Sequence, residues 1–301
     1  MTSLSQVRVL APAKINLFLA VTGVRPDGFH ELVSLVVPVD VGDVLDIRLE
    51  PELEEDQLDL AGFPVPGALD DNLVMRAIRL FRKRVPEIGM VRVQLKKKIP
   101  VGAGLGGGSS DAVAALKAMN ALCGEPLSRE VLIELATELG SDCPLFVDGK
   151  PVWMRGRGEV LMPVSEALAE AICALRFVIF KPAFGVDTAW AYSQLRKNAA
   201  SSYVDTRWAE AQVRDWEKSL NAGDARLFNS FERPVSMKYP ALAVLLDILR
   251  KEGFMSVMSG SGSACFLVLQ ADSDCDKVYS CVREAWGADT FMIETRAQDR
   301  Y

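Results

Sequence analysis

The sequence predicts an α+β fold in two domains, and three observations support this prediction. The chain has 301 residues, which corresponds to about two domains of ordinary size. Strand patterns with a period of two residues and helical patterns occur in both halves. The composition, with 50% hydrophobic and 25% charged residues, is that of a globular protein with enough apolar material for a core. We expect the two domains to comprise residues 1–158 and 159–301.

The first half contains most of the predicted strands. Leu45, Ile47 and Leu49 alternate with charged residues, which is typical of a half-buried strand. Apolar residues that share one helical face predict a helix over residues 72–85. The turn sequence Arg25-Pro26-Asp27-Gly28 separates two earlier strands. The other elements expected here are strands at 15–21, 31–39 and 91–95 and helices at 109–122 and 128–139.

The second half follows a turn at Gly156-Arg157-Gly158. It shows neither an internal repeat nor a low-complexity linker, so we expect the two halves to pack closely. A further expected strand, at 152–154, precedes this turn. The expected strands of the second half lie at 176–181, 255–258 and 265–269, followed by a short closing strand, and its helices lie at 188–196, 206–220, 241–251 and 274–286.

Charge and cysteine content narrow the function classes. The chain has 34 Lys and Arg against 40 Asp and Glu, a net charge of −6 that disfavours binding to a nucleic-acid backbone. Its six cysteines form no CxxC pair and His30 is the single histidine, which argues against a zinc site. The longest uncharged run, 253–271, contains Ser-Gly-Ser-Gly-Ser, which is typical of a loop and not of a membrane span. We therefore expect a cytoplasmic protein with reduced thiols, a monomer or weak homodimer without nucleic-acid or membrane partners.

The strongest local motif is a glycine tract between a predicted strand and a predicted helix. Such a tract lets the backbone approach a ligand closely, and the start of the following helix offers unpaired N–H groups and the positive end of its dipole. This arrangement predicts a phosphate-binding loop. Its candidate contact residues are Pro100, Val101, Gly102, Ala103, Gly104, Leu105, Gly106, Gly107, Gly108, Ser109 and Ser110.

Three common phosphate loops do not fit the context of this motif. Gly102, Gly104 and Gly107 satisfy GxGxxG, but no second strand ending in an acid follows at the distance a dinucleotide-binding fold requires. A P-loop would end in Gly-Lys-Ser or Gly-Lys-Thr, and the tract has no lysine. A protein kinase would need a His-Arg-Asp catalytic loop, and the sole histidine lies elsewhere.

The motif resembles the central nucleotide motif of the GHMP small-molecule kinases. Residues 11–19 (Ala-Pro-Ala-Lys-Ile-Asn-Leu-Phe-Leu) resemble the N-terminal motif of that family, and residues 259–266 (Ser-Gly-Ser-Gly-Ser-Ala-Cys-Phe) resemble its C-terminal glycine loop. The resemblance implies an N-terminal domain like domain 2 of ribosomal protein S5, a C-terminal ferredoxin-like domain and an active site between them. It also implies transfer of the γ-phosphoryl group of ATP to an alcohol, with Mg²⁺ bridging the phosphates through Ser109 or Ser110 and water.

Other segments resemble the branch of the family whose acceptor is a cytidylyl-linked methylerythritol, in the non-mevalonate route to isoprenoid precursors. The resemblance includes a departure, because Phe29 stands where tyrosine is common. The segments are 12–16, 23–30, 71–73, 139–144, 158–159 and 229–234.

Two residues carry the expected catalysis. Lys14 lies among apolar residues, where an unpaired charge is costly, so it either reaches solvent or meets an anion. Asp142 lies between Gly140 and Pro144, where an aspartate is most often a turn or cap residue. The resemblance implies that Asp142 is the base that accepts the proton of the attacking hydroxyl and that Lys14 lies beside it. Asp111 and Asp148 are rivals for the role of base.

The remaining candidates concern the two substrates. The resemblance implies that Phe29 and His30 form a platform for the cytosine base, although a lone histidine is more often an ordinary surface residue. Asn16, Asp187 and Thr188 are weaker candidates for contacts with the acceptor. Asn72 is a candidate for the adenine nucleotide, and it is equally well explained as a helix cap.

Overall fold

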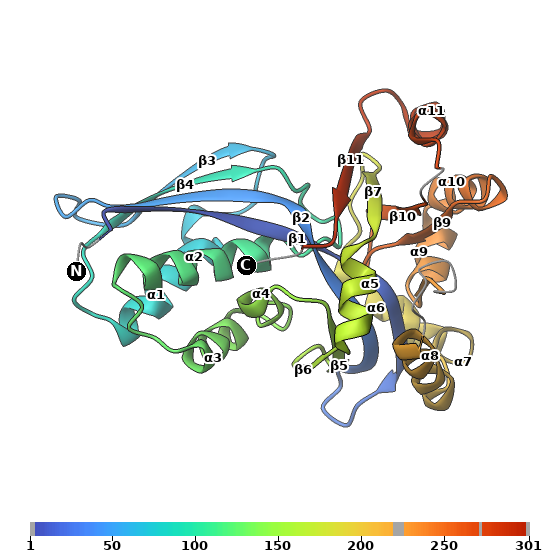
Figure 1. Ribbon diagram of the computed structural model, residues 1–301, viewed down its shortest axis with the longest axis horizontal. Helices are drawn as coiled ribbons and strands as arrows, with labels where there is room; N and C mark the ends of the chain where they lie inside the picture. The colour runs from blue at the N-terminus through green and yellow to red at the C-terminus, as the bar shows by residue number, and fades with distance from the viewer. Residues whose placement is uncertain (1–3, 219–225, 271–272, 299–301) are drawn as a thin grey trace.

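The computed structural model describes residues 4–218, 226–270 and 273–298, which form two α+β halves joined side by side (Figure 1). A long antiparallel hairpin of β1 (Gln6–Val24) and β2 (His30–Leu49) runs from the first half into the junction with the second. The predicted turn connects the two strands. The sequence predicted separate strands at 31–39 and 45–49, and this was wrong, because β2 is continuous. Gly42 permits the continuity, since a β-carbon there would lie 2.2 Å from the backbone oxygen of Ala11.

The first sheet has seven strands, in the order β3-β4-β2-β1-β8, with β5 paired to β2 and β6 paired to β5. Alternating burial along β4 confirms the period of two seen in its sequence. The strands β3, β6 and β8 were not predicted. The further bounds are β3 (Gln57–Gly62), β4 (Val91–Lys97), β5 (Val152–Gly156), β6 (Val160–Pro163) and β8 (Phe228–Asn229).

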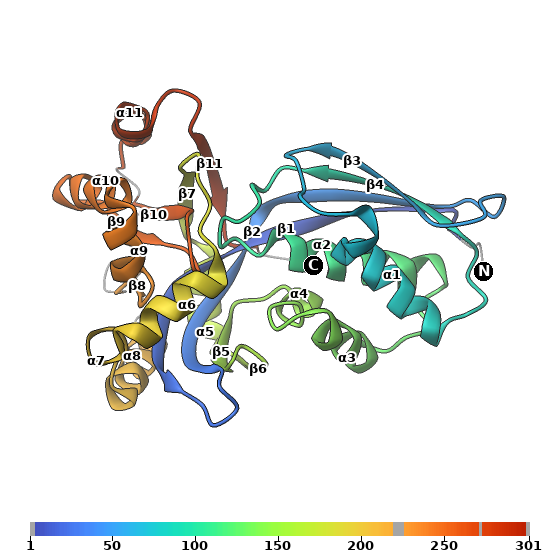
Figure 2. The same ribbon diagram turned by 180° about the vertical axis from the view of Figure 1, so that it is seen from behind.

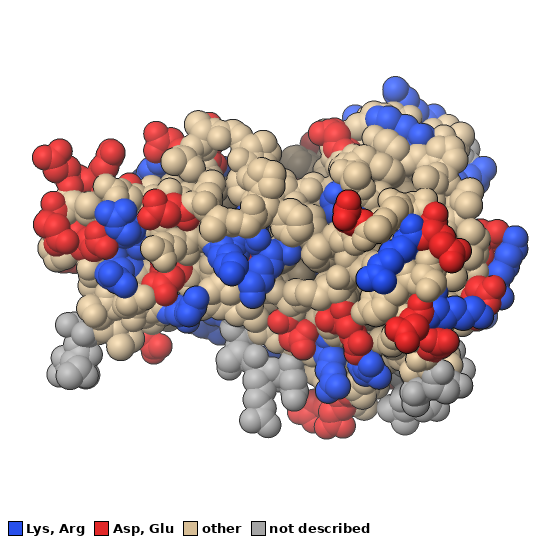
Figure 3. Space-filling model, turned by 90° about the horizontal axis from the view of Figure 1, so that it is seen from above, with Lys and Arg blue, Asp and Glu red and all other residues tan. Residues whose placement is uncertain are grey.

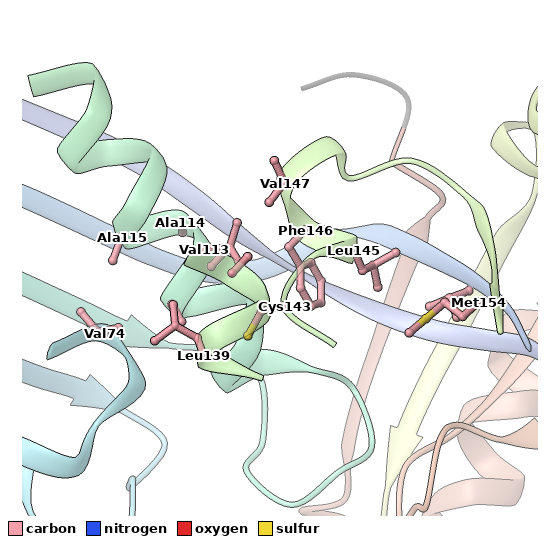
Figure 4. Packing of buried hydrophobic residues seen from close by; sticks show 14 of the residues in the cluster. Val74, Val113, Ala114, Ala115, Leu139, Cys143, Leu145, Phe146, Val147 and Met154 are labelled. Carbon is pink, nitrogen blue, oxygen red and sulfur yellow. The ribbon is translucent and has the colours of Figure 1, made fainter. Parts of the chain in front are cut away.

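The helices of the first half lie on one face of this sheet, as both ribbon views show (Figure 2). The predicted helices are confirmed, with α2 beginning two residues earlier than expected, inside the glycine tract. Helix α2 is buried along most of its length between the sheet and its neighbouring helices, and apolar side chains of α2, α3 and α4 gather there (Figure 4). The bounds are η1 (Leu69–Asp71), α1 (Leu73–Arg84), α2 (Gly107–Leu122), α3 (Arg129–Leu139) and α4 (Leu145–Asp148).

The second half contains an antiparallel sheet in the order β11-β7-β10-β9. Its predicted strands are confirmed, whereas α5, α7 and α9 were missed. The predicted helix at 206–220 is observed to residue 218, and its last two residues lie outside the described part of the chain. The bounds are α5 (Glu166–Cys173), β7 (Arg176–Lys181), α6 (Thr188–Lys197), α7 (Ala199–Ser202), α8 (Thr206–Lys218), α9 (Glu232–Lys238), α10 (Pro240–Lys251), β9 (Met255–Met258), β10 (Cys265–Leu269), α11 (Cys275–Trp286) and β11 (Phe291–Arg296).

The two halves interlock. Strand β8, from the second half of the sequence, pairs in parallel with β1 at Phe18–Phe228 and Leu19–Asn229. Strand β6 begins at Val160 and pairs with β5, and a single bridge joins Val39 to Ala297. A domain boundary at residue 158 therefore stays a prediction, because β6 and β8 follow that position and belong to the first sheet. Within the described ranges no helix combines the length and the apolar character needed to cross a membrane.

Candidate active site

The glycine loop joins β4 to α2 and supplies a backbone-built anion site. Gly102, Gly104 and Gly106 have φ angles of 65°, 75° and 72°, which residues with a β-carbon rarely adopt. Gly106 caps α2, and the amide of Ser110 makes the first helical hydrogen bond, to the Gly106 carbonyl at 2.9 Å. The preceding N–H groups of α2 thus have no intrahelical partner and lie at the positive end of the helix dipole. This geometry suits a phosphate group.

A second glycine loop, residues 259–263, packs against the first. The amide of Ala264 donates to the Ala103 carbonyl at 3.0 Å, and the Ser259 hydroxyl donates to the Gly104 carbonyl at 3.2 Å. A β-carbon on Gly104 would lie 2.2 Å from the Ser259 carbonyl oxygen, so only glycine permits this approach. The side chain of Asn229 holds the second loop by donating to the carbonyls of Met258 and Gly260, at 2.6 and 2.8 Å. The two halves of the molecule therefore meet at the glycine loops.

Lys14 is held between these loops. Its amide donates to the Leu105 carbonyl at 2.9 Å, and its ammonium donates to Asn16 Oδ1 at 2.8 Å. The Lys14 side chain lies close to both loops. A β-carbon on Gly106 would be 3.0 Å from Lys14 Cγ, and a β-carbon on Gly260 would be 3.3 Å from Lys14 Nζ. The side chain is buried, and this burial lowers the pKa of Lys14, while the charge of Asp142 opposes the shift. The ammonium is thus fixed beside the site where a phosphate would bind.

Asp142 follows the end of α3 and faces Lys14 across the cleft. Its carboxylate forms no hydrogen bond or ion pair with another described residue. A β-carbon on Gly158 would lie 3.9 Å from Asp142 Oδ1, which places the β5–β6 turn beside this carboxylate. Burial, followed by the charge of Asp142, raises the pKa of Tyr192 to about 12, so this tyrosine is a neutral neighbour. The Asp142 carboxylate is therefore free to accept a proton or a ligand.

The rival aspartates are engaged elsewhere. Asp111 Oδ2 lies 2.6 Å from Lys97 Nζ, and Asp148 Oδ1 lies 2.6 Å from Arg129 Nε. Each rival thus has a cationic partner in the fold, whereas Asp142 has a cation, Lys14, across an open cleft.

A first cavity of about 690 Å³ collects most of the predicted residues. Asn72 lines it while its side chain accepts from the Val74 amide at 2.9 Å as the cap of α1. Apart from Phe29 and His30, two predicted residues do not line it. Ser110 is buried with an unpartnered hydroxyl, and Asp187 caps α6 by accepting from the Trp190 amide at 2.6 Å. The predicted residues that line it are Lys14, Asn16, Asn72, Pro100, Val101, Gly102, Ala103, Gly104, Leu105, Gly106, Gly107, Gly108, Ser109, Asp142 and Thr188.

A second cavity of about 750 Å³ adjoins the first and contains Phe29 and His30. Phe29 is 52% exposed, whereas His30 is buried and its ring contacts that of Tyr192, with centroids 4.8 Å apart. His30 Nε2 lies 3.1 Å from the Tyr203 hydroxyl. Burial, followed by the charge of Arg196, lowers the pKa of His30, so the imidazole is neutral near pH 7. The sequence pointed to Phe29 and His30 but gave no sign of the two tyrosines.

A buried charge cluster that the sequence analysis missed lies under the start of α2. The Lys97 ammonium is between Asp43 Oδ2 and Asp111 Oδ2, and Asp43 Oδ1 accepts from the amides of Lys98 and Ile99 at 2.5 and 2.8 Å. Burial raises the pKa of Asp111 to about 7, although Lys97 opposes this shift. The sequence did contain a sign that Lys97 is buried. Every second residue of strand β4, Val91, Val93 and Leu95, is buried, and Lys97 is the next residue in that series. The cluster fixes the strand that leads into the glycine loop.

Comparisons with known proteins agree with this geometry. The sequence matches the GHMP kinases N terminal domain over residues 72–150 and the GHMP kinases C terminal domain over residues 210–288. A 4-diphosphocytidyl-2-C-methyl-D-erythritol kinase from Desulfitobacterium hafniense (strain Y51) is 35% identical over 288 residues, 93% of each chain. The enzyme of the same name from Synechococcus sp. (strain CC9902) is 37% identical over 286 residues, 89% of each chain.

Solved structures of other proteins have the same fold as this chain. A crystal structure of 4-(cytidine 5'-diphospho)-2C-methyl-D-erythritol kinase has a TM-score of 0.76 and 32% identity, covering 97% of this chain and 100% of its own. A homoserine kinase from Cytophaga hutchinsonii shares the fold at 19% identity, with a TM-score of 0.75 over 100% of this chain and 97% of its own. The glycine loops, the facing Lys14 and Asp142 and these matches lead to one conclusion. This chain belongs to the GHMP kinase family, within its group of 4-diphosphocytidyl-2-C-methyl-D-erythritol kinases.

Proposed function

We propose that this protein transfers the γ-phosphoryl group of ATP to the C2 hydroxyl of 4-diphosphocytidyl-2-C-methyl-D-erythritol, a step of isoprenoid precursor synthesis. The observation that carries the proposal is the pair of adjoining cavities. One has a backbone-built phosphate site, the other has an aromatic platform, and Asp142 lines the first where the two meet. A donor and an acceptor could thus bind side by side with their reacting groups at Asp142.

In the first cavity the glycine loop holds the ATP phosphates through backbone N–H groups at the start of α2. The Lys14 ammonium neutralises negative charge that develops on the transferred phosphoryl group. Phosphoryl transfer depends on positioning and charge stabilisation more than on covalent work by the protein, which suits this rigid cradle. Val65 and Asn72 also line the first cavity, and the nucleoside of ATP would lie against them.

At the junction, Asp142 accepts the proton of the attacking C2 hydroxyl as that oxygen bonds to phosphorus. The carboxylate, which has no hydrogen-bond partner among the described residues, and the nearby Lys14 support this role, because a general base must be unengaged and positioned by its surroundings. Tyr192 is a neutral neighbour of this carboxylate, whose charge helps to raise the pKa of the tyrosine.

The proposal includes Mg²⁺ with ATP. The described residues contain no cluster of three or more His, Cys, Asp or Glu side chains suited to a metal ion. They fit the usual magnesium arrangement of kinases, in which phosphates and water supply most ligands and the protein adds one or two oxygens. Ser109 lines the cavity and would offer a hydroxyl oxygen. Bound Mg²⁺ would neutralise charge on the β- and γ-phosphates.

In the second cavity Phe29 and His30 receive the cytosine, with Tyr192 as a second ring. Neutral His30 can accept one hydrogen bond and donate another, and its contact with Tyr203 fixes one of its ring nitrogens. Asn16 and Thr188 face the methylerythritol side from the first cavity. We propose no ligand contact for Asp187, because it caps α6.

The cellular setting is also a proposal. None of the six cysteines, all of which lie in the described ranges, forms a disulfide, which supports a reducing compartment such as the cytoplasm. Acidic and basic side chains are interspersed over much of the face seen from above, around the hollow between the two halves (Figure 3). Together with the net charge of −6, this supports a monomer or weak homodimer that binds small molecules without nucleic-acid or membrane partners.

The test is ADP formation with a panel of acceptors. We expect ADP release from ATP and Mg²⁺ to rise strongly with the cytidylyl alcohol and to stay at background with homoserine or mevalonate. Stimulation by another alcohol alone would support a GHMP kinase of different specificity. Background ADP release with every acceptor would support a nucleotide-binding protein without kinase activity.

A further inference from the structure

The two cavities share a junction. Four described residues line both of them, namely Gly140, Ser141, Arg157 and Tyr192. Arg157 is the one charged residue of this set. Because Asp142 lines only the first cavity and the Phe29–His30 platform only the second, any molecule that spans both must pass these four residues.

Arg157 is placed at the junction by a tight turn between β5 and β6. Its neighbours Gly156 and Gly158 have φ angles of 68° and 116°, and the Arg157 amide donates to Glu159 Oε2 at 2.6 Å. Gly158 packs beside Asp142, and the Arg157 guanidinium lies 5.0 Å from the centroid of the Phe29 ring. The turn therefore lies beside the carboxylate of the first cavity at Gly158 and reaches the aromatic ring of the second through Arg157.

The guanidinium of Arg157 is available to a ligand. Its nitrogens form no hydrogen bond or close ion pair with another described residue, and its charge acts at longer range on Asp27, where it helps to lower the pKa of that carboxyl. Other arginines nearby are committed, since Arg155 pairs with Glu210 and Arg196 donates to the Gly28 carbonyl at 2.7 Å. The Phe29 ring supports the free guanidinium through a cation–π contact and leaves its N–H edges open.

The charges around the junction show which ligand group needs this arginine. Asp142 is acidic, and the carbonyl end of α3 stops at Leu139 and carries partial negative charge. Glu159 also lines the second cavity, but its charge is partly compensated by Arg25, whose Nη1 lies 3.6 Å from Glu159 Oε1. An anionic group at the junction would be repelled unless a cation compensated it. A planar guanidinium matches phosphate oxygens with two parallel hydrogen bonds, which a lysine cannot reproduce.

We propose that Arg157 binds the diphosphate that connects the two ends of the acceptor and thereby selects cytidine diphosphate-linked alcohols. The inference rests on the proposed function, because it takes the alcohol to lie at Asp142 and the base at Phe29 and His30. The diphosphate between these ends crosses the junction, where Arg157 is the cation that faces it. Lys14 is not an alternative, since it lines only the first cavity and donates to Asn16.

The test compares CDP with cytidine in calorimetric titrations of the full-length protein. Charge-assisted hydrogen bonds of this kind are worth about 10- to 100-fold in affinity. We expect Arg157→Ala to weaken CDP binding by about that factor, while cytidine binding changes by about twofold or less. Arg157→Lys should recover part of the loss, because it restores the charge without the two-pronged geometry. Lys197→Ala is the matched control, since Lys197 lines the second cavity but not the junction.

Two outcomes would overturn the inference. One is an equal loss of CDP and cytidine affinity in Arg157→Ala, which would indicate a structural role or a contact with the base. The other is an equal loss of CDP affinity in Lys197→Ala, which would indicate a general effect of charge. Kinase assays separate this inference from the proposed function. CDP binding that depends on Arg157 without acceptor phosphorylation would contradict only the function, and phosphorylation with unchanged CDP affinity in Arg157→Ala would contradict only the inference.

Discussion

The two cavities that meet at Asp142 are built in different ways. The first is made of backbone: a continuous glycine loop, the start of α2 and a second glycine loop packed on it. The second is made of side chains from separate segments, among them Phe29, His30, Tyr192 and Arg157. Backbone recognition suits a phosphate group shared by many kinases, whereas side-chain recognition suits the part of the acceptor that differs between them. Specificity should therefore reside in the second cavity and chemistry in the first.

The largest effect should come from the base between the cavities. We expect Asp142→Asn to lower kcat by about 10²–10⁴, the usual contribution of a positioned general base. Binding of CDP and of a non-hydrolysable ATP analogue should persist, because neither the glycine loop nor the aromatic platform changes. Steady-state kinetics and calorimetry on the folded variant measure both. Near-normal turnover in Asp142→Asn would remove this residue from the mechanism.

The next largest effect should come from adding a β-carbon to the glycine loop, and only at positions where that carbon would meet other atoms closely. In Gly106→Ala the new carbon would lie 3.0 Å from Lys14 Cγ and 2.9 Å from Phe146 Cζ at a φ of 72°. The variant must displace Lys14 or the loop, and we expect kcat/KM for ATP to fall by about 100-fold, as small misplacements of catalytic groups do.

Gly108→Ala is the matched control for this substitution. Its β-carbon would meet only Leu73 Cδ1, at 3.7 Å, and its φ lies outside the left-handed region. We expect little change in kcat/KM for ATP. An equal loss in both variants would show that the loop excludes any side chain, irrespective of what that side chain meets.

Substitutions in the second cavity should affect the acceptor alone. Stacking of a base on an aromatic ring is worth about 1–3 kcal/mol by alanine substitution, or roughly 5- to 150-fold in affinity. We expect Phe29→Ala and His30→Ala to raise the KM for the cytidylyl acceptor within this range, while the KM for ATP stays nearly constant. Unchanged acceptor KM in both variants would place the base elsewhere and favour a kinase for a smaller alcohol.

The smallest effect concerns the protonation of His30. Its pKa in the folded protein lies below the ordinary value of 6.5, so the unfolded chain binds a proton there before the folded protein does. The stability contributed by neutral His30 is thus present above pH 6.5 and is lost as the pH falls toward the folded pKa. Urea unfolding between about pH 7.5 and 5.5 should show a steeper loss of stability in the native protein than in His30→Gln. Parallel pH profiles would contradict the buried, neutral imidazole.

The same contrast between backbone and side chains explains what the sequence could predict. The glycine tract, Lys14 and most helices follow from local patterns, because turns, caps and periodicity are properties of neighbouring residues. Tyr192 and Tyr203 could not be found this way, since they reach His30 only through the packing of α6 and α7 against the first half. The continuity of β2 was missed because Gly42 looked like a break between two strands. Its place inside one strand is explained by its close contact with β1, which local sequence patterns do not reveal.

The central claim is that the two cavities bind two ligands at once, and a single titration tests it most directly. Asp142→Asn saturated with a non-hydrolysable ATP analogue and Mg²⁺ would be titrated with CDP in a calorimeter. Occupation of separate cavities predicts that one CDP binds per chain, with an affinity that the analogue changes by about threefold or less. Displacement of the ATP analogue by CDP would show that both compete for one cavity and would contradict the account.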